Sequence, residues 1–263
     1  MTTNLFSKED RTNKMQATIR RMIDSFFRSR SLALVRVSPD GFPVDFRDEE
    51  KEIVREVSPW TMTSSERVYA LIQAVKYISS SEVPGAIVEC GVWKGGGMAA
   101  AARILLREQD PERELYLFDT FEGMCEPTPP DRDRKGKQAS DILREMPSSR
   151  CDDAPLESVK KVLYDTGYPK AKIHFVQGRV ETTIPDRAPD SISLLRLDTD
   201  WYESTKHELI HLFPRLSPRG VIIIDDYGHW LGCRQACDEY FTQNRIPILL
   251  NRIDYTGRIA LKV

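Results

Sequence analysis

The sequence predicts a doubly wound, Rossmann-like α/β fold whose sheet is mostly parallel and ends in an antiparallel hairpin. Three observations predict it. Between residues 86 and 224, short runs of β-branched residues and leucine alternate with helical segments, as in parallel sheets covered on both faces. Several of these runs end in an acid, at the sheet edge where such folds bind ligands. The last two runs, 248–253 and 259–263, flank a glycine-containing turn and favour a hairpin.

Length and composition favour one sizeable domain with additions, and they disfavour two classes of partner. The chain has 263 residues, 40% of them hydrophobic, which is enough for one core. Its formal net charge of −2 gives no electrostatic case for nucleic acid or an anionic membrane. The N-terminus has no apolar signal segment, and no run approaches the roughly 18 apolar residues of a membrane span, so a cytoplasmic protein is expected. Five cysteines, an odd number, predict free thiols.

The chain is expected to comprise an N-terminal helical extension, residues 1–60, and a main domain, residues 61–263. In the extension, apolar residues between 15 and 26 recur at helical spacing. This pattern fits a helix packed on the body or on another subunit, or a lid over a cleft. The polar, proline-rich segment 122–150 has no core pattern, so it is expected to be a mobile insertion.

Strands and helices alternate along the main domain. The expected strands cover residues 86–89, 115–119, 173–176, 192–197 and 221–224. The expected helices cover residues 64–78, 98–107, 154–166, 203–213 and 234–244, the first of them with a serine cap.

Acids at the ends of the first two strands suggest the kind of ligand. The first strand runs into Glu89 and a glycine-rich turn, where a ligand can approach the backbone closely. The dinucleotide pattern G-x-G-x-x-G is absent, and Glu89 would repel a pyrophosphate but attract an ammonium group. Asp119 ends the second strand and is placed to bind a ribose diol, or to cap the next turn. Together these acids describe an amino-acid nucleoside better than a dinucleotide.

A denser group of acids follows the fourth and fifth strands. These strands run into Asp198-Thr199-Asp200 and Asp225-Asp226. Four carboxylates at adjacent strand ends are unfavourable unless a positive group neutralises them. Hard oxygen ligands of this kind suit Mg²⁺, although a solvated acidic rim or helix caps remain as alternatives. The doubled aspartate directly after four β-branched residues is the most specific single signal in the chain.

Five segments resemble the macrocin-type O-methyltransferases, class I methyltransferases that act on sugar hydroxyls of natural products. They are VECGVWKGGG, LFDTFEG, LRLDTDWYEST, GVIIIDDYG and GCRQACDEYF. The resemblance covers roughly residues 60–263 and implies a seven-stranded class I methyltransferase sheet, S-adenosylmethionine as donor and Mg²⁺ as an essential ion. Residues 63–66 depart from the family's Ile-Gly-rich run, which leaves the acceptor open.

The resemblance also implies roles by position. The donor would be bound by Thr61, Met62, Thr63, Glu89, Gly91, Gly95, Asp119, Gly178 and Asp198. The metal ligands would be Asp198, Asp225 and Asp226. Asp200 would be the general base that accepts the proton of an acceptor hydroxyl whose pKa the ion lowers. Asp200 could instead orient the ligands, and His229 is a second candidate base.

Several alternatives concern the acceptor and the class of protein. A sugar with vicinal hydroxyls, on a glycoside natural product or a polysaccharide, is the expected acceptor, and a catechol-like diol is the alternative. A nicotinamide-dependent oxidoreductase is disfavoured because about 30 residues separate Glu89 from Asp119, where the dinucleotide fingerprint expects about 20. A non-catalytic relic that only binds partners is disfavoured because the set of aspartates is intact. A homodimer or higher homo-oligomer is expected, since an amphipathic N-terminal helix is a common dimerisation device.

Overall fold

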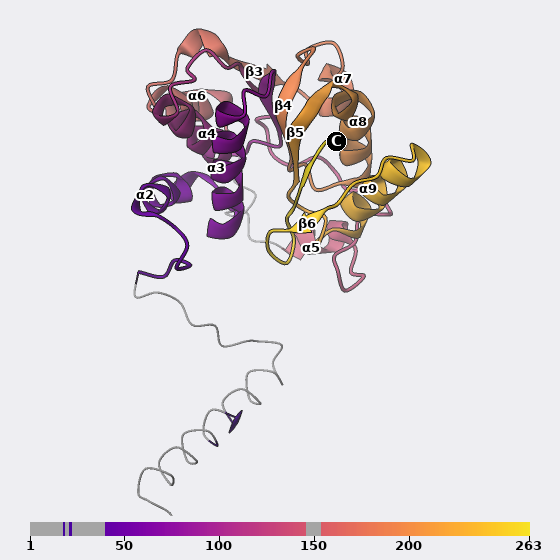
Figure 1. Ribbon diagram of the computed structural model, residues 1–263. Coiled ribbons are helices and arrows are strands. Elements are labelled where there is room, and N and C mark those ends of the chain that lie inside the picture. Colours follow the sequence, from indigo (N-terminus) through magenta and orange to yellow (C-terminus); the bar gives the residue numbers. More distant parts are fainter. Residues whose placement is uncertain (1–17, 19–20, 23–39, 146–153) are drawn as a thin grey trace, which may run out of the picture. The chain divides into compact units, whose positions relative to one another are not determined.

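The computed structural model describes residues 18, 21–22, 40–145 and 154–263 (Figure 1). The chain forms two units, Met1–Phe46 and Arg47–Val263. In the first unit, residues 18 and 21–22 are helical, and residues 40–46 form a turn in which the Phe46 amide donates to the Pro43 carbonyl at 3.2 Å. The rest of the amphipathic pattern between residues 15 and 26 lies outside the described residues, as does Cys151.

A seven-stranded sheet forms the centre of the second unit, in the order β3-β2-β1-β4-β5-β7-β6. Its strands are β1 (Ala86–Cys90), β2 (Leu115–Asp119), β3 (Ile173–Gln177), β4 (Ile192–Leu197), β5 (Leu216–Ile224), β6 (Asn251–Arg252) and β7 (Arg258–Leu261). Strands β1 to β5 pair in parallel, and β7 pairs antiparallel with both β5 and β6. The predicted sheet and hairpin are confirmed. Strand β5 begins earlier than expected because Leu216 already pairs with Ile192.

Helices cover both faces of this sheet (Figure 1). On one face, α2 (Asp48–Val57), α3 (Ser65–Ser80), α4 (Gly96–Arg107) and α6 (Leu156–Tyr164) contact one another. On the other face lie α7 (Val180–Thr183), α8 (Tyr202–Leu212) and α9 (Leu231–Gln243). Because both faces are covered, β1 and β4 are buried at every residue. Among the helices described, none has the length and apolar character that crossing a bilayer requires.

Helix ends agree with the predicted ones to within a few residues, and three helices, α2, α5 (Ala139–Glu145) and α7, were not expected. The predicted serine cap is confirmed, since the Ser64 hydroxyl accepts a hydrogen bond from the Arg67 amide at 3.2 Å. Helix α2 was not expected because Pro39, Gly41, Pro43 and Pro59 break the regularity of residues 31–60, although three acids open the helix. Helix α7 has four residues, too few to show a helical period. The four cysteines in the described part of the chain are free thiols, as predicted.

Residues 122–145, the described part of the expected mobile insertion, are tied to the main domain by polar contacts. Asp131 is fully buried and accepts hydrogen bonds from the amide and hydroxyl of Thr128, at 2.7 and 2.8 Å. Its other oxygen accepts from the amide of Tyr202, at the start of α8, at 2.8 Å. A side chain on Gly232, at the start of α9, would collide with Asp131. The segment lacks an apolar pattern because a buried carboxylate, more than a run of apolar side chains, holds it in place.

We predict that Asp131→Ala destabilises the fold by about 1–3 kcal/mol, because it leaves buried amide and hydroxyl donors without acceptors. Urea unfolding at neutral pH measures the change. The matched control is Asp141→Ala in α5 (Ala139–Glu145). The carboxylate of Asp141 is half-exposed and pairs with Arg144. This variant should therefore lower the free energy of unfolding by less than about 0.5 kcal/mol. Equal losses in the two variants would show that Asp131 does not anchor the segment.

Candidate active site

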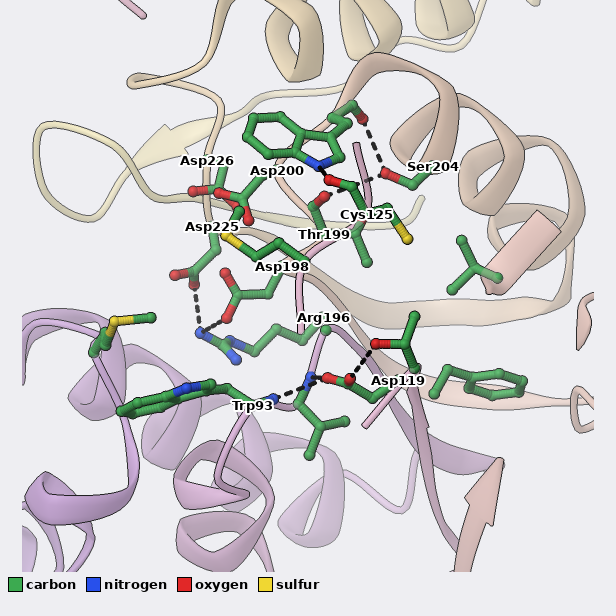
Figure 2. A pocket seen from close by; sticks show the side chains of 18 of the residues that line it. Trp93, Asp119, Cys125, Arg196, Asp198, Thr199, Asp200, Ser204, Asp225 and Asp226 are labelled. Carbon is green, nitrogen blue, oxygen red and sulfur yellow. Dashed lines mark hydrogen bonds and ion pairs between the residues drawn. The ribbon is translucent and has the colours of Figure 1, made fainter. Parts of the chain in front are cut away.

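A cavity of about 440 Å³ opens at the carboxyl ends of the central strands (Figure 2). The sheet register brings these ends together, because Cys90 pairs with both Phe118 and Leu197, and Leu197 pairs with Ile224. Ten residues expected in the site line this cavity: Thr61, Met62, Thr63, Gly91, Asp119, Gly178, Asp198, Asp200, Asp225 and Asp226. Glu89 and Gly95 do not line it. The structure thus gathers most of the expected residues in one place, while their roles stay predictions.

The glycine-rich turn after β1 lies directly against the end of β4. Gly91 has a φ of +82°, and a side chain there would collide with the carbonyl oxygen of Asp198. The Asp198 amide in turn donates to the Cys90 carbonyl at 2.8 Å. Gly95 has a different reason for being glycine, since a side chain there would contact Leu163 and Val159 of α6. Gly95 therefore allows α4 and α6 to pack, and the expectation that it meets the donor has no support from its surroundings.

Glu89 lies just behind the cavity wall, with 2% of its surface exposed. It is the direct neighbour of Arg196 across the β1–β4 pair, and its Oε1 forms an ion pair with that guanidinium. Burial raises the pKa of Glu89, and the charge of Arg196 opposes the rise. Its Oε2 is buried and accepts no hydrogen bond within the described protein. An oxygen left in this way is costly unless a ligand supplies a donor.

Asp119 lines the cavity and at the same time braces two turns. Its Oδ2 accepts from the amides of Val92 and Trp93, at 2.6 and 2.9 Å, and its Oδ1 accepts from the Phe121 amide at 2.8 Å (Figure 2). The alternative considered from the sequence, a carboxylate that caps the next turn, is therefore present. The Thr120 hydroxyl also lies 3.4 Å from Oδ1, but its shorter hydrogen bond, at 2.7 Å, goes to the Gly123 carbonyl. A carboxylate offers about four lone-pair sites, so one of them is left for a ligand hydroxyl.

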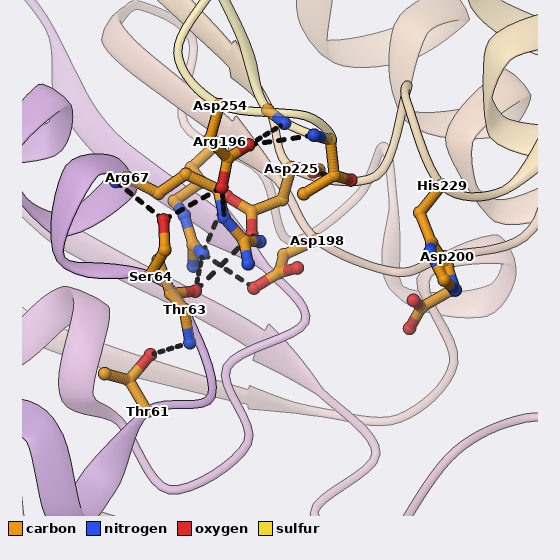
Figure 3. A network of polar contacts seen from close by, with 12 residues as sticks. Thr61, Thr63, Ser64, Arg67, Arg196, Asp198, Asp200, Asp225, His229 and Asp254 are labelled. Carbon is orange, nitrogen blue, oxygen red and sulfur yellow. Dashed lines mark hydrogen bonds and ion pairs between the residues drawn. The ribbon is translucent and has the colours of Figure 1, made fainter. Parts of the chain in front are cut away.

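A buried arginine that the sequence analysis missed joins the two groups of acids. Arg196 is 4% exposed, and its Nη1 pairs with Glu89. Its Nη2 lies 2.8 Å from Thr63 Oγ1, 2.8 Å from Asp198 Oδ2 and 2.9 Å from Asp225 Oδ1 (Figure 3). One signal was available: a charged residue inside an otherwise apolar buried strand needs charged partners.

A second arginine, Arg67 from the first turn of α3, reaches the same carboxylates (Figure 3). It forms an ion pair with Asp225 Oδ2, and its Nε lies 3.1 Å from Asp254 Oδ2. Burial alone would lower the pKa of Arg67, but Asp225, Asp198 and Asp254 raise it above its ordinary value, so it stays charged. No sequence signal marked Arg67 or Asp254, because they are 187 residues apart along the chain.

The other three aspartates of the site have too few positively charged neighbours to balance their own negative charge. Burial raises the pKa of Asp198 well above its ordinary value, and although Arg196 opposes this, Asp225 and Asp226 add to it. Burial, followed by the charges of Asp200 and Asp225, raises the pKa of Asp226 in the same way. Burial and the charge of Asp198 raise the pKa of Asp200 to about 7. Binding of a cation would relieve this imbalance.

Asp200 is held in a fixed orientation at the far side of the cavity from the arginines (Figure 3). Its backbone has a φ of +65°, which is rare for a residue other than glycine. Its Oδ1 accepts a hydrogen bond from the indole of Trp230 at 2.7 Å, and that ring packs on Trp201 with centroids 5.0 Å apart. His229 also lines the cavity, but its Nδ1 faces the Tyr255 hydroxyl at 3.1 Å.

Two features decide whether these residues could hold a divalent cation: the kind of ligand atom that they offer, and the groups that already contact those atoms. Asp225 Oδ1 and Asp226 Oδ2 are buried oxygens that accept no hydrogen bond from the described residues, and hard oxygens of this kind are the ligands that Mg²⁺ prefers. Arg196 lies within ion-pair distance of Asp225 Oδ1 without forming a hydrogen bond. Within the described ranges, however, no three His, Cys, Asp or Glu side chains are gathered as a ready metal site. The oxygen ligands suit the ion, but Arg196 and Arg67 already contact two of the three aspartates. Arg196 contacts Asp198, and both arginines contact Asp225.

The sheet order, the glycine turn after the first strand and the acids at the strand ends define a class I methyltransferase. The chain belongs to the macrocin-O-methyltransferase (TylF) family, whose family model matches residues 1–261. It is therefore an S-adenosylmethionine-dependent O-methyltransferase.

Relatives and solved structures agree with this assignment. The chain is 34% identical over 200 residues to a tetracenomycin rhamnosyl 4'-O-methyltransferase of Streptomyces olivaceus, covering 75% of this chain and 73% of the relative. It is 31% identical over 201 residues to mycinamicin III 3''-O-methyltransferase of Micromonospora griseorubida, covering 75% and 76%. The structure of the O-methyltransferase NovP matches with a TM-score of 0.67 and 29% identity, over 78% of this chain and 82% of that one.

We predict that Gly91→Ala costs more stability than Gly136→Ala, and that it weakens donor binding. Both glycines have positive φ, +82° and +86°, so alanine strains each backbone by about 1–2 kcal/mol. Only at Gly91 does the new methyl group also meet backbone atoms, which adds about 1–3 kcal/mol. Urea unfolding and calorimetric titration with S-adenosylhomocysteine measure the two effects. Equal stability losses would mean that the β1 turn does not rest on β4 as described.

Proposed function

We propose that this enzyme transfers the methyl group of S-adenosylmethionine to a hydroxyl of a sugar, on a glycosylated natural product or a polysaccharide. In this proposal Asp200 is the general base, and Asp198, Asp225 and Asp226 hold a Mg²⁺ ion. One observation carries the proposal. The turns after β1 and β2, where the donor is expected to bind, line the same cavity as the paired carboxylates after β4 and β5. The names of the relatives add support, since one of them acts on a rhamnosyl compound.

The donor fits the groups that the protein leaves without partners. Its ammonium group supplies hydrogen-bond donors for Glu89 Oε2, which accepts none within the described protein. One of its ribose hydroxyls suits the lone-pair site that Asp119 has left. Gly178, which follows β3 with a φ of +133°, lines the same cavity and leaves space for the adenine.

The reaction is an in-line displacement. The acceptor oxygen attacks the methyl carbon, the carbon–sulfur bond breaks, and S-adenosylhomocysteine leaves with the bonding electron pair. Asp200 accepts the proton of the acceptor hydroxyl, and Trp230 fixes the orientation of the carboxylate for this step. Mg²⁺, when bound, lowers the pKa of the acceptor hydroxyl. The buried tryptophans Trp201 and Trp230 exclude water from this side of the cavity.

Two variants should separate donor binding from catalysis. We expect Asp200→Asn to lower kcat by about 10²- to 10⁴-fold, because a general base is lost, with the Kd for S-adenosylhomocysteine within about twofold of the parent. We expect Glu89→Gln to raise that Kd by about tenfold or more, because a charge-assisted hydrogen bond is lost. Calorimetric titration and steady-state kinetics with radiolabelled donor measure both. The opposite pattern, in which Asp200→Asn loses donor affinity, contradicts the assignment.

Metal removal tests the second part of the proposal. Methyl transfer to a panel of rhamnosides and related glycosides, with a catechol included, should cease in EDTA and return with excess Mg²⁺ or Mn²⁺. Asp225→Asn should not recover, since it lacks a charged ligand. Mass spectrometry identifies the methylated product and thus the acceptor class. Turnover that continues undiminished in EDTA removes the metal from the mechanism while leaving methyl transfer intact.

A further inference from the structure

We infer that Arg67 is a built-in counter-ion that competes with the divalent cation for Asp225, and that it moves onto Asp254 when the cation binds. The inference rests on the proposed function, because it takes Asp225 as a metal ligand. It adds a residue that controls how tightly the ion is held and that belongs to neither the metal ligands nor the general base.

Asp225 is fully buried, and both of its oxygens face a guanidinium group. Arg67 pairs with Oδ2, and the Nη2 of Arg196 lies 2.9 Å from Oδ1 (Figure 3). A doubly charged ion cannot bind either oxygen at coordination distance while a guanidinium nitrogen remains in contact with it, since the two cations repel strongly in a buried site. Binding at Oδ2 therefore requires Arg67 to give way, and binding at Oδ1 requires Arg196 to do so.

The surroundings of Arg196 fix it in place. Its side chain is 5% exposed and comes from the middle of the sheet, where Glu89 is its direct neighbour in register. It also donates to Thr63 Oγ1 at 2.8 Å and lies 2.8 Å from Asp198. Moving it would leave the buried Glu89 without its counter-charge, which is costly.

Arg67, by contrast, has a second partner within reach. Its side chain is 14% exposed and begins in the first turn of α3, and its Nε already lies 3.1 Å from Asp254 Oδ2. A small rotation about its terminal bonds would exchange Asp225 for Asp254 without leaving the guanidinium unpaired.

Hydrogen bonds fix Asp254 in a position where it can accept the guanidinium group of Arg67. Its Oδ1 accepts from the amides of Thr256 and Gly257, at 2.9 and 2.7 Å, and Ser64 donates to its Oδ2 at 2.9 Å. These bonds keep the carboxylate charged, and they lower its pKa although burial opposes them. The guanidinium therefore has an ordered anionic acceptor in both states.

The test measures metal affinity directly, without donor, acceptor or turnover. The full-length protein is titrated with Mn²⁺, and free Mn²⁺ is followed by electron paramagnetic resonance. We expect Arg67→Met to bind Mn²⁺ at least tenfold more tightly than the parent protein, because the competitor is gone. We expect Asp254→Asn to bind it at least threefold more weakly, because the displaced guanidinium loses its acceptor.

Two further variants test whether the change in Mn²⁺ affinity comes from the contacts of Arg67 or from net charge alone. Arg67→Lys keeps the charge but loses the planar fork through which different nitrogens of the guanidinium pair with Asp225 and Asp254, so it should bind Mn²⁺ with an affinity between those of the parent and Arg67→Met. It also serves if Arg67→Met does not fold. Arg134→Gln is the matched control for charge alone: it removes a guanidinium that lies 5.8 Å from the ring of Tyr255, a residue of the same cavity. Its Mn²⁺ affinity should stay within twofold of the parent.

The outcomes distinguish this inference from the proposed function. If the parent protein binds no Mn²⁺, or if Asp225→Asn binds it equally well, the proposed metal site fails and the inference fails with it. If Asp225→Asn abolishes binding while both Arg67 variants bind like the parent, the metal site stands and the role of Arg67 is overturned. A gain for Arg134→Gln as large as that for Arg67→Met would reduce the effect to net charge and also overturn it.

Discussion

The site depends on one constraint: several carboxylates are buried side by side, and their charge must be balanced. A parallel sheet brings the ends of β1, β4 and β5 to one edge, and this chain places an acid at each of them. Arg196 and Arg67 supply the only permanent positive charge that contacts Asp198 and Asp225 in the described part of the chain. Burial raises the pKa of Asp198 and of Asp226, and neighbouring carboxylates add to the rise, so a cationic ligand would stabilise the charged forms of both.

The same constraint explains how the surroundings are built. The turn after β1 has glycine at position 91 because it must lie against β4, and this contact puts the glycine-rich turn next to the carboxylates that follow β4. On the opposite side, Trp230 and the strained backbone at Asp200 fix one carboxylate apart from the arginines. Asp131 then anchors the segment before α5 to the starts of α8 and α9, so polar contacts help to hold this part of the chain in place.

Local patterns predicted most of the fold and ten of the residues that line the cavity. The strands and the acids that end them were predicted because both signals lie within a few residues, as in Val221–Asp226. The roles of Arg67, Asp254 and Asp131 could not be predicted, because their partners are distant along the chain and no local pattern marks them. Arg196 was within reach of prediction, as a charge inside an apolar strand. At Gly95 the sequence did not reveal that glycine allows two helices to pack, and its contact with the donor stays a prediction.

The most direct test is anomalous diffraction from crystals grown with Mn²⁺ and S-adenosylhomocysteine. A single map would locate the ion and the donor sulfur relative to the same carboxylates. The charge-balance account predicts an Mn²⁺ peak among Asp198, Asp225 and Asp226, with the donor bound along the turn after β1. A donor bound there with no metal peak among the three aspartates, in crystals soaked to saturation, would contradict it.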